Sequence, residues 1–147
     1  MRSPASIANH PIHPMIVVFP IALWIFSLVC DLIALNVSTS AVWFTVAFYT
    51  MAGGLIGALV AAVPGLIDLL YYQGGLPPVK KIALTHMAIN LTAVALYTVN
   101  IWLRASGQEN MTLPVLLSVV GVCLIAVSGW LGGQMVHVYG VGVEGRE

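Results

Sequence analysis

Four long apolar stretches, almost free of charge, constrain this chain more than any other feature of its sequence. They cover approximately residues 14–35, 41–72, 80–104 and 113–138. Crossing the hydrocarbon of a bilayer takes about 20 apolar residues in a helix, and each stretch reaches that length. Only 7% of the 147 residues are charged, against about a quarter in a typical soluble domain. The sequence therefore predicts an integral membrane protein with one transmembrane domain over residues 1–147.

Short connections join these stretches and predict their arrangement. Segments of only a few residues separate neighbouring stretches. Those after the first and third stretches are polar, and the one after the second is rich in glycine and proline. Short loops join antiparallel neighbours, so an all-α, up-down four-helix transmembrane bundle is expected. The stretches lack the alternation of polar and apolar residues that a membrane barrel requires.

Lysine and arginine give the expected orientation of the bundle. An even number of spans places both termini on one side, which carries Arg2, Lys80, Lys81 and Arg146, against Arg104 alone on the other. Because positive charge marks the cytoplasmic side, we expect both termini in the cytoplasm. The formal net charge of zero leaves no basic surface for nucleic acid.

Polar side chains that can bind a ligand gather toward this predicted cytoplasmic face. Two of them precede the first span, and the others lie toward the same ends of the other three: His10, His13, Asp68, His86, Asn90 and His137. Asp68 follows Pro64, which we expect to kink its helix. Ionisable groups inside a membrane are costly, by about 2.5 kcal/mol or more at the centre, and mark functional sites. The pattern therefore predicts a site at one end of the bundle.

Histidines on separate helices favour a metal or haem ligand. Haem b takes two axial imidazoles, and bundle cores house such cofactors. His86 is the best-placed ligand, with His13 on the diagonal helix or, less suitably, His137 on the adjacent helix as its partner. A compact group of His10, His13, His86 and Asp68 would instead suit a zinc, iron or copper ion.

Structural roles compete with these cofactor roles. Asn90 lies one turn after His86, where it can support a bound group by a hydrogen bond or bridge two helices. His13 can cap the first helix or bind a lipid headgroup. Asp68 can pair with His86 or with a lysine.

The opposite end of the bundle carries a separate charged pair. Asp31 lies near the end of the first span and Arg104 ends the third, so an ion pair is expected there. The second span has small residues at helical spacing, which allow close helix packing in membranes: Gly54, Ala58, Ala61 and Gly65.

Four motifs, in order and at matching spacing, resemble a known family. They are "HPIHPMIVVFPIALW", "PGLIDLLYY", "HMAIN" and "SGWLGGQMVHVYGVGV". Together they resemble the bacterial membrane-protein family called domain of unknown function 2231, over nearly the whole chain. The resemblance implies four spans in a bacterial inner membrane. It also implies redox work, because some members are joined to Rieske or cytochrome modules. Its polar positions correspond to His10, His13, Asp68, His86 and Asn90, whereas His137 stands where an aromatic residue is expected.

Three functions are compatible with this sequence. The first is a membrane b-type cytochrome-like protein that exchanges electrons with a redox partner or quinone. The second is a protein that binds a metal ion, and the third is a non-catalytic assembly module, including a homo-oligomer packed through small-residue faces. No serine–histidine–aspartate arrangement, phosphate loop or carboxylate dyad is evident, so an enzyme acting alone is not expected.

Overall fold

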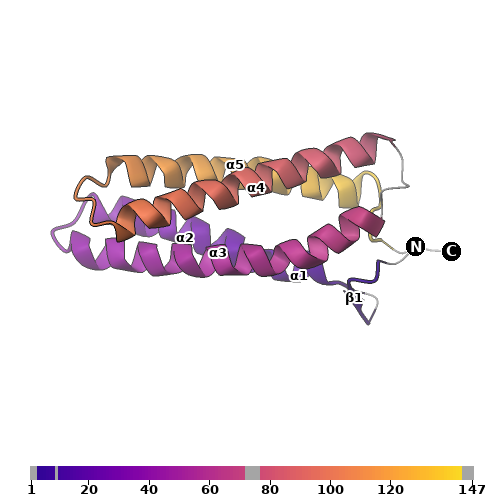
Figure 1. The fold of residues 1–147 in the computed structure, drawn as a ribbon, viewed down its shortest axis with the longest axis horizontal. Coiled ribbons are helices and arrows are strands. Elements are labelled where there is room, and N and C mark those ends of the chain that lie inside the picture. The colour runs from indigo at the N-terminus through magenta and orange to yellow at the C-terminus, as the bar shows by residue number, and fades with distance from the viewer. Residues whose placement is uncertain (1–2, 9, 72–76, 144–147) are drawn as a thin grey trace.

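The computed structural model describes residues 3–8, 10–71 and 77–143, and most of them are helical. Long antiparallel helices run side by side along one axis (Figure 1). The helices are α1 Ile12–Ile16, α2 Val18–Ala34, α3 Ser40–Tyr71, α4 Pro77–Ala105 and α5 Thr112–His137. Four helical spans in this part of the chain, with α1 and α2 forming one of them, are long and apolar enough to cross a membrane. The predicted all-α membrane bundle is confirmed.

Prolines account for the helix starts and the one interruption. The third span begins at Pro77 rather than near Lys80, because proline suits the first helical turn, where its missing N–H has no intrahelical acceptor. Pro20 lacks the N–H that would bond to Ile16, and the helix breaks at Val17, between α1 and α2. Helix α3 continues through Pro64 and bends toward its C-terminal end (Figure 1).

A short β-hairpin precedes the first span. Strand β1, Ser6–Ile7, pairs antiparallel with β2, His10–Pro11. The N–H of Ile12 then donates to the carbonyl of Ala5 at 3.0 Å. The hairpin is thus tied directly to the start of α1, which fixes the approach of the chain to His13.

The helices form a ring in which α2 and α4 lie on a diagonal. Helix α2 packs on α3 and α5, and α4 packs on α5 and α3. The described ends of the chain, the C-terminal end of α3 and the N-terminal end of α4 lie at the same end of the bundle (Figure 1). The side of the membrane on which the termini lie stays a prediction. Arg2 and Arg146, which the predicted orientation used, lie outside the described residues.

The two halves of the bundle repeat the same contacts. We call α1–α3 the first hairpin and α4–α5 the second hairpin. Adding 73 to the residue number relates polar and aromatic side chains of α1 and α2 to those of α4: His13, Trp24, Ser27 and Asp31 correspond to His86, Tyr97, Asn100 and Arg104. Adding 67 relates acceptor carbonyls of α3 to those of α5: Ala47, Met51 and Ala61 correspond to Pro114, Ser118 and Ser128.

Hydrogen bonds follow this correspondence in both hairpins. His13 bonds the carbonyl of Ala61, and its counterpart His86 bonds the carbonyl of Ser128. The side chains that correspond to Trp24 and Ser27 likewise bond the corresponding carbonyls of α5. Because α2 and α4 run in the same direction, the hairpins are related by an approximate two-fold axis along the bundle.

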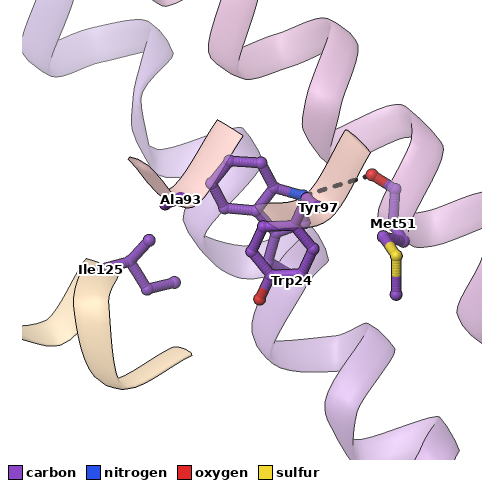
Figure 2. Close-up of a cluster of buried hydrophobic side chains, with 5 residues drawn as sticks. All are labelled: Trp24, Met51, Ala93, Tyr97 and Ile125. Atoms are coloured by element: carbon purple, nitrogen blue, oxygen red, sulfur yellow. Dashed lines mark hydrogen bonds between the residues drawn. The ribbon is translucent and has the colours of Figure 1, made fainter. Parts of the chain in front are cut away.

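An aromatic pair fills the centre of the bundle on this axis. The rings of Trp24 and Tyr97 stack with centroids 4.1 Å apart and planes 12° apart, in a cluster with Met51, Ala93 and Ile125 (Figure 2). Gly54 admits the Trp24 ring, since a Cβ there would lie 2.6 Å from it. The close packing predicted for the small residues of the second span is confirmed at this position.

Candidate functional site

Two histidines from diagonal helices face one another at the end of the bundle where the chain begins. His13 comes from α1 and His86 from α4, and their ring centroids lie 6.4 Å apart with planes at 85°. Both side chains are half-buried. The structure therefore brings together the two residues that the sequence favoured as paired ligands.

Helix α3 holds the His13 ring in place. The Nδ1–H of His13 donates to the carbonyl of Ala61 at 2.8 Å, because a carbonyl can only accept. Gly65 makes room for the ring, since a Cβ there would lie 2.8 Å from Nδ1. Pro64 beside it leaves the carbonyl of Val60 without its helical donor, which loosens this turn of α3.

A closed ring of hydrogen bonds holds His86. Its Nδ1–H lies 2.8 Å from the carbonyl and 2.9 Å from the hydroxyl oxygen of Ser128. The Ser128 hydroxyl donates to Oδ1 of Asn90 at 2.9 Å, and the Asn90 amide donates to Nε2 of His86 at 3.0 Å. These directions require a neutral His86 with its proton on Nδ1. The sequence placed Asn90 beside His86, but the role of Ser128 was missed.

Both rings therefore present the same nitrogen for a ligand. Each Nδ1–H is used by a backbone carbonyl of the adjacent helix. Metal-binding histidines commonly use one ring N–H in this way, which fixes the tautomer and leaves the other nitrogen as the ligand. The pair can thus offer two imidazole Nε2 atoms, provided that Asn90 releases His86.

The other predicted site residues do not join this pair in one group. His10 lies in β2 with an exposed ring, and its Nδ1–H donates to the carbonyl of Ala8 at 2.7 Å. Asp68 accepts a hydrogen bond from the hydroxyl of Ser3. His137 is exposed at the end of α5. Among the described residues, no three His, Cys, Asp or Glu side chains gather closely enough to hold a metal ion.

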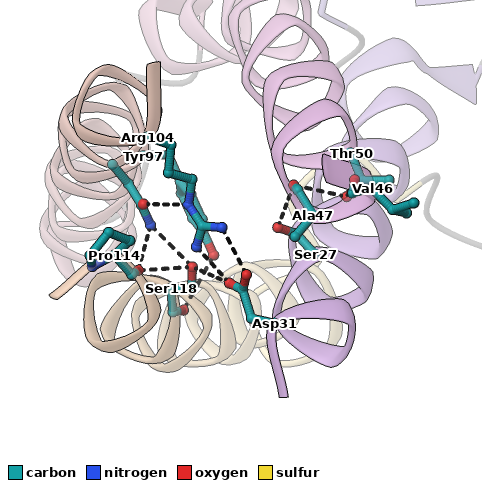
Figure 3. Close-up of polar contacts among 10 residues, drawn as sticks. Ser27, Asp31, Val46, Ala47, Thr50, Tyr97, Arg104, Pro114 and Ser118 are labelled. Atoms are coloured by element: carbon teal, nitrogen blue, oxygen red, sulfur yellow. Dashed lines mark hydrogen bonds and ion pairs between the residues drawn. The ribbon is translucent and has the colours of Figure 1, made fainter. Parts of the chain in front are cut away.

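A second polar centre lies between the same two diagonal helices, α2 and α4, toward the opposite end of the bundle. Two nitrogens of the Arg104 guanidinium donate to the two carboxylate oxygens of Asp31, each at 2.8 Å (Figure 3). The two side chains are 3% and 0% exposed. The ion pair predicted from the sequence is confirmed, and it lies deeper inside the protein than a surface pair.

Two residues that the sequence reasoning missed complete this centre. Asn100 accepts from Nε of Arg104 at 3.0 Å and donates to the Ser118 hydroxyl at 3.0 Å. Ser118 in turn donates to Asp31 at 3.1 Å. Asn100 stands one helical turn before Arg104, and that spacing was the available signal. In the described part of the chain, every buried side-chain polar atom has a hydrogen-bond partner.

The first span (α1 and α2) and α4, which lie diagonally opposite in the ring of helices, therefore meet in three layers along the bundle. We call this line of contact the diagonal. The layers are, in order, the His13–His86 pair, the stacked aromatic pair, and the Asp31–Arg104 ion pair. We call the first the histidine end and the last the ion-pair end. Each layer consists of residues that correspond to one another in the two hairpins.

Comparison with known proteins places this arrangement in a family. No curated protein and no solved structure matches the chain. A family model described as "Predicted membrane protein (DUF2231)" matches residues 9–145, which include both hairpins and all three layers. The chain therefore belongs to the DUF2231 family of predicted membrane proteins.

Proposed function

We propose that this protein is a membrane b-type cytochrome in which His13 and His86 are the axial ligands of haem iron. The observation that carries the proposal is the matched histidine pair on the two-fold axis. Each ring is oriented by a bond from Nδ1 to a corresponding carbonyl. His10, Asp68 and His137 correspond to Ala83, Met135 and Leu70 of the other hairpin, so they lack a matching ligand.

The separation of the two rings supports shared binding of one metal atom. Two imidazole nitrogens at about 2.0–2.1 Å from one metal atom lie about 4 Å apart, and their ring centres are about an ångström further out on each side. The observed centroid separation of 6.4 Å agrees with that spacing. Bound haem would supply one-electron chemistry, while the protein contributes the ligands and their orientation.

The position of the site sets the kind of partner. Both histidines lie at one end of the bundle, and a bilayer core is about 30 Å thick. One site near one surface exchanges electrons with a quinone or a redox subunit on the same side. Lys80 and Lys81 lie near this end, and positive charge favours the cytoplasmic side, so we propose that this end lies at the cytoplasmic face of a bacterial inner membrane.

An absorbance spectrum tests the proposal. The full-length protein, purified in detergent and incubated with haemin, should show a Soret band, and dithionite should sharpen its α-band. His13→Ala and His86→Ala should each lose the low-spin spectrum. His10→Ala and His137→Ala are matched controls that should keep it. Absence of a Soret band in the reconstituted protein would overturn the proposal.

Elemental analysis separates haem from a bare ion. Zinc, iron or copper bound without haem would appear as stoichiometric metal in protein that has no Soret band. The chemistry of two imidazoles suits such an ion too, but a bare ion needs further ligands. Metal that persists in a His13→Ala/His86→Ala variant would exclude this pair as the metal site.

A further inference from the structure

The two hairpins differ at one point of the histidine end. The residues that correspond to Asn90 and Ser128 in the first hairpin are Val17 and Ala61. Their apolar side chains cannot reproduce the closed ring of hydrogen bonds around His86. The corresponding backbone bonds to Nδ1 are retained. The difference lies in the Ser128 hydroxyl, which is 2.9 Å from Nδ1 of His86, and in the Asn90 amide at Nε2, the nitrogen that would bind a metal atom.

This difference makes the two histidines unequal as ligands. Nε2 of His86 accepts a hydrogen bond from the Asn90 amide at 3.0 Å. The His13 ring, by contrast, makes one side-chain hydrogen bond among the described residues, from Nδ1 to the carbonyl of Ala61. An incoming metal atom can bind His13 directly, but at His86 it must first displace the amide.

We propose that Asn90 is a gate on His86, which makes His13 the permanent axial ligand and His86 the exchangeable one. The proposal rests on the proposed haem function. The Asn90 amide competes with iron for one lone pair, and Ser128 holds Asn90 in the competing position through its hydroxyl. The site then keeps one axial position open to a small exogenous ligand such as carbon monoxide.

The gate predicts a spectroscopic difference that a purely structural role would not produce. Haemin-loaded full-length protein should contain a high-spin ferric fraction, and its ferrous form should bind carbon monoxide. Asn90→Val installs the residue that the first hairpin carries at the corresponding position. It should shift the ferric haem toward the low-spin, six-coordinate form and weaken carbon monoxide binding about fivefold, the effect of removing one competing hydrogen bond.

Two further variants keep the test independent of folding. Ser128→Ala leaves the backbone carbonyl that orients His86 and removes the hydroxyl, which holds Asn90 and also lies 2.9 Å from Nδ1 of His86, so it should shift the spin state in the same direction by less. The double change Val17→Asn/Ala61→Ser installs the same pair beside His13 and should increase the high-spin fraction. His86→Ala should be high-spin whether or not Asn90 is present.

The outcomes separate the gate from the haem proposal. A haem-loaded Asn90→Val protein with the spin state and carbon monoxide affinity of the wild type would overturn the gate alone. Wild-type and variant proteins that all lack a Soret band would overturn the haem function and the gate with it. Low-spin wild-type haem that excludes carbon monoxide would also contradict an exchangeable His86.

Discussion

The two ends of the diagonal use corresponding residues for different purposes. At the ion-pair end, Asp31 and Arg104 bind each other through two hydrogen bonds. Asn100 accepts from Nε of Arg104, and Ser118 donates to the carboxylate of Asp31. At the histidine end, another position of the repeat carries two rings, each bonded through Nδ1 to a backbone carbonyl, and Nε2 of His86 also accepts from the Asn90 amide. One repeated hairpin thus builds a self-contained contact at one end and a pair able to take a ligand at the other.

This difference teaches how polar groups can be placed in an apolar bundle. A buried charge is tolerated only when it is paired and hydrogen-bonded, and the ion-pair end meets that condition without any ligand. The histidine end instead uses two imidazole rings, each with one N–H bonded to a backbone carbonyl. The comparison predicts that damage at the ion-pair end affects folding, whereas damage at the histidine end affects binding.

Removing one partner of the ion pair should have the largest effect. Arg104→Ala leaves the Asp31 carboxylate buried without its partner, and we expect a loss of about 3–5 kcal/mol in the free energy of unfolding. Thermal unfolding in detergent measures it. The control is Asp31→Leu/Arg104→Met, which should recover most of the loss because apolar residues need no partner. A double variant as unstable as the single one would contradict the comparison.

Glycines beside the diagonal should separate stability from binding. Gly54→Ala places a Cβ 2.6 Å from the Trp24 ring, and such overpacking should lower the unfolding free energy by about 1–3 kcal/mol. Gly65→Ala places a Cβ 2.8 Å from Nδ1 of His13. Because His13 is only half-buried and its ring can move aside, the main effect of Gly65→Ala should be weaker haemin binding, measured by titration at the Soret band.

The control for both glycine variants is Gly133→Ala. Outside the backbone of its own helix, no heavy atom lies within 4 Å of a Cβ at Gly133, so haemin binding should not change and stability should not fall, since alanine favours a helix more than glycine does. Equal losses of stability in Gly54→Ala and Gly65→Ala, with unchanged haemin binding in the latter, would show that the two ends do not differ as proposed.

The smallest effect is expected in the middle layer. The hydroxyl of Tyr97 donates to the carbonyl of Ser118 over a long 3.5 Å, while the ring makes the stacking contact with Trp24. Tyr97→Phe keeps the ring and should change the unfolding free energy by less than about 1 kcal/mol. Tyr97→Leu, which loses the stack, should cost more in the same unfolding assay. A larger loss in Tyr97→Phe would mean that the hydroxyl, and not the ring, stabilises this layer.

Much of the fold was predictable because it depends on long, coarse signals. Lengths of apolar stretches predicted the spans, and antiparallel order alone brought His13 and His86 to one end. The Asp31–Arg104 pair followed from the same reasoning. These inferences need only the direction of each helix, which short connections determine.

The repeat was missed because it survives in positions more than in residue types. In each hairpin a histidine of the first span is followed eleven residues later by an aromatic residue. Two of the glycines in the second span are also eleven apart: Gly54 and Gly65, or Gly121 and Gly132. Eleven residues are about three helical turns, which places both members of each set on one face. The correspondence is hard to see further along the helices, because Asp31 of the first hairpin corresponds to Arg104 of the second, a residue of opposite charge.

The partners of His86 could not be predicted for a different reason. Asn90 lies one turn away on the same helix, so its proximity follows from helical spacing. Ser128 comes from α5, and its contact depends on how that helix is rotated about its own axis. Apolar residues surround all faces of α5, so the sequence pattern gives no preferred inward face.

The repeated unit also bears on how the chain enters a membrane. Each hairpin crosses twice and returns to the face from which it started, so a second hairpin added in tandem inserts with the orientation of the first. A repeat of one or three spans would instead be inverted at its second copy. Tandem doubling of this unit therefore brings like ends to like faces, and residues at corresponding positions, such as His13 and His86, meet at the same depth without any change in insertion signals.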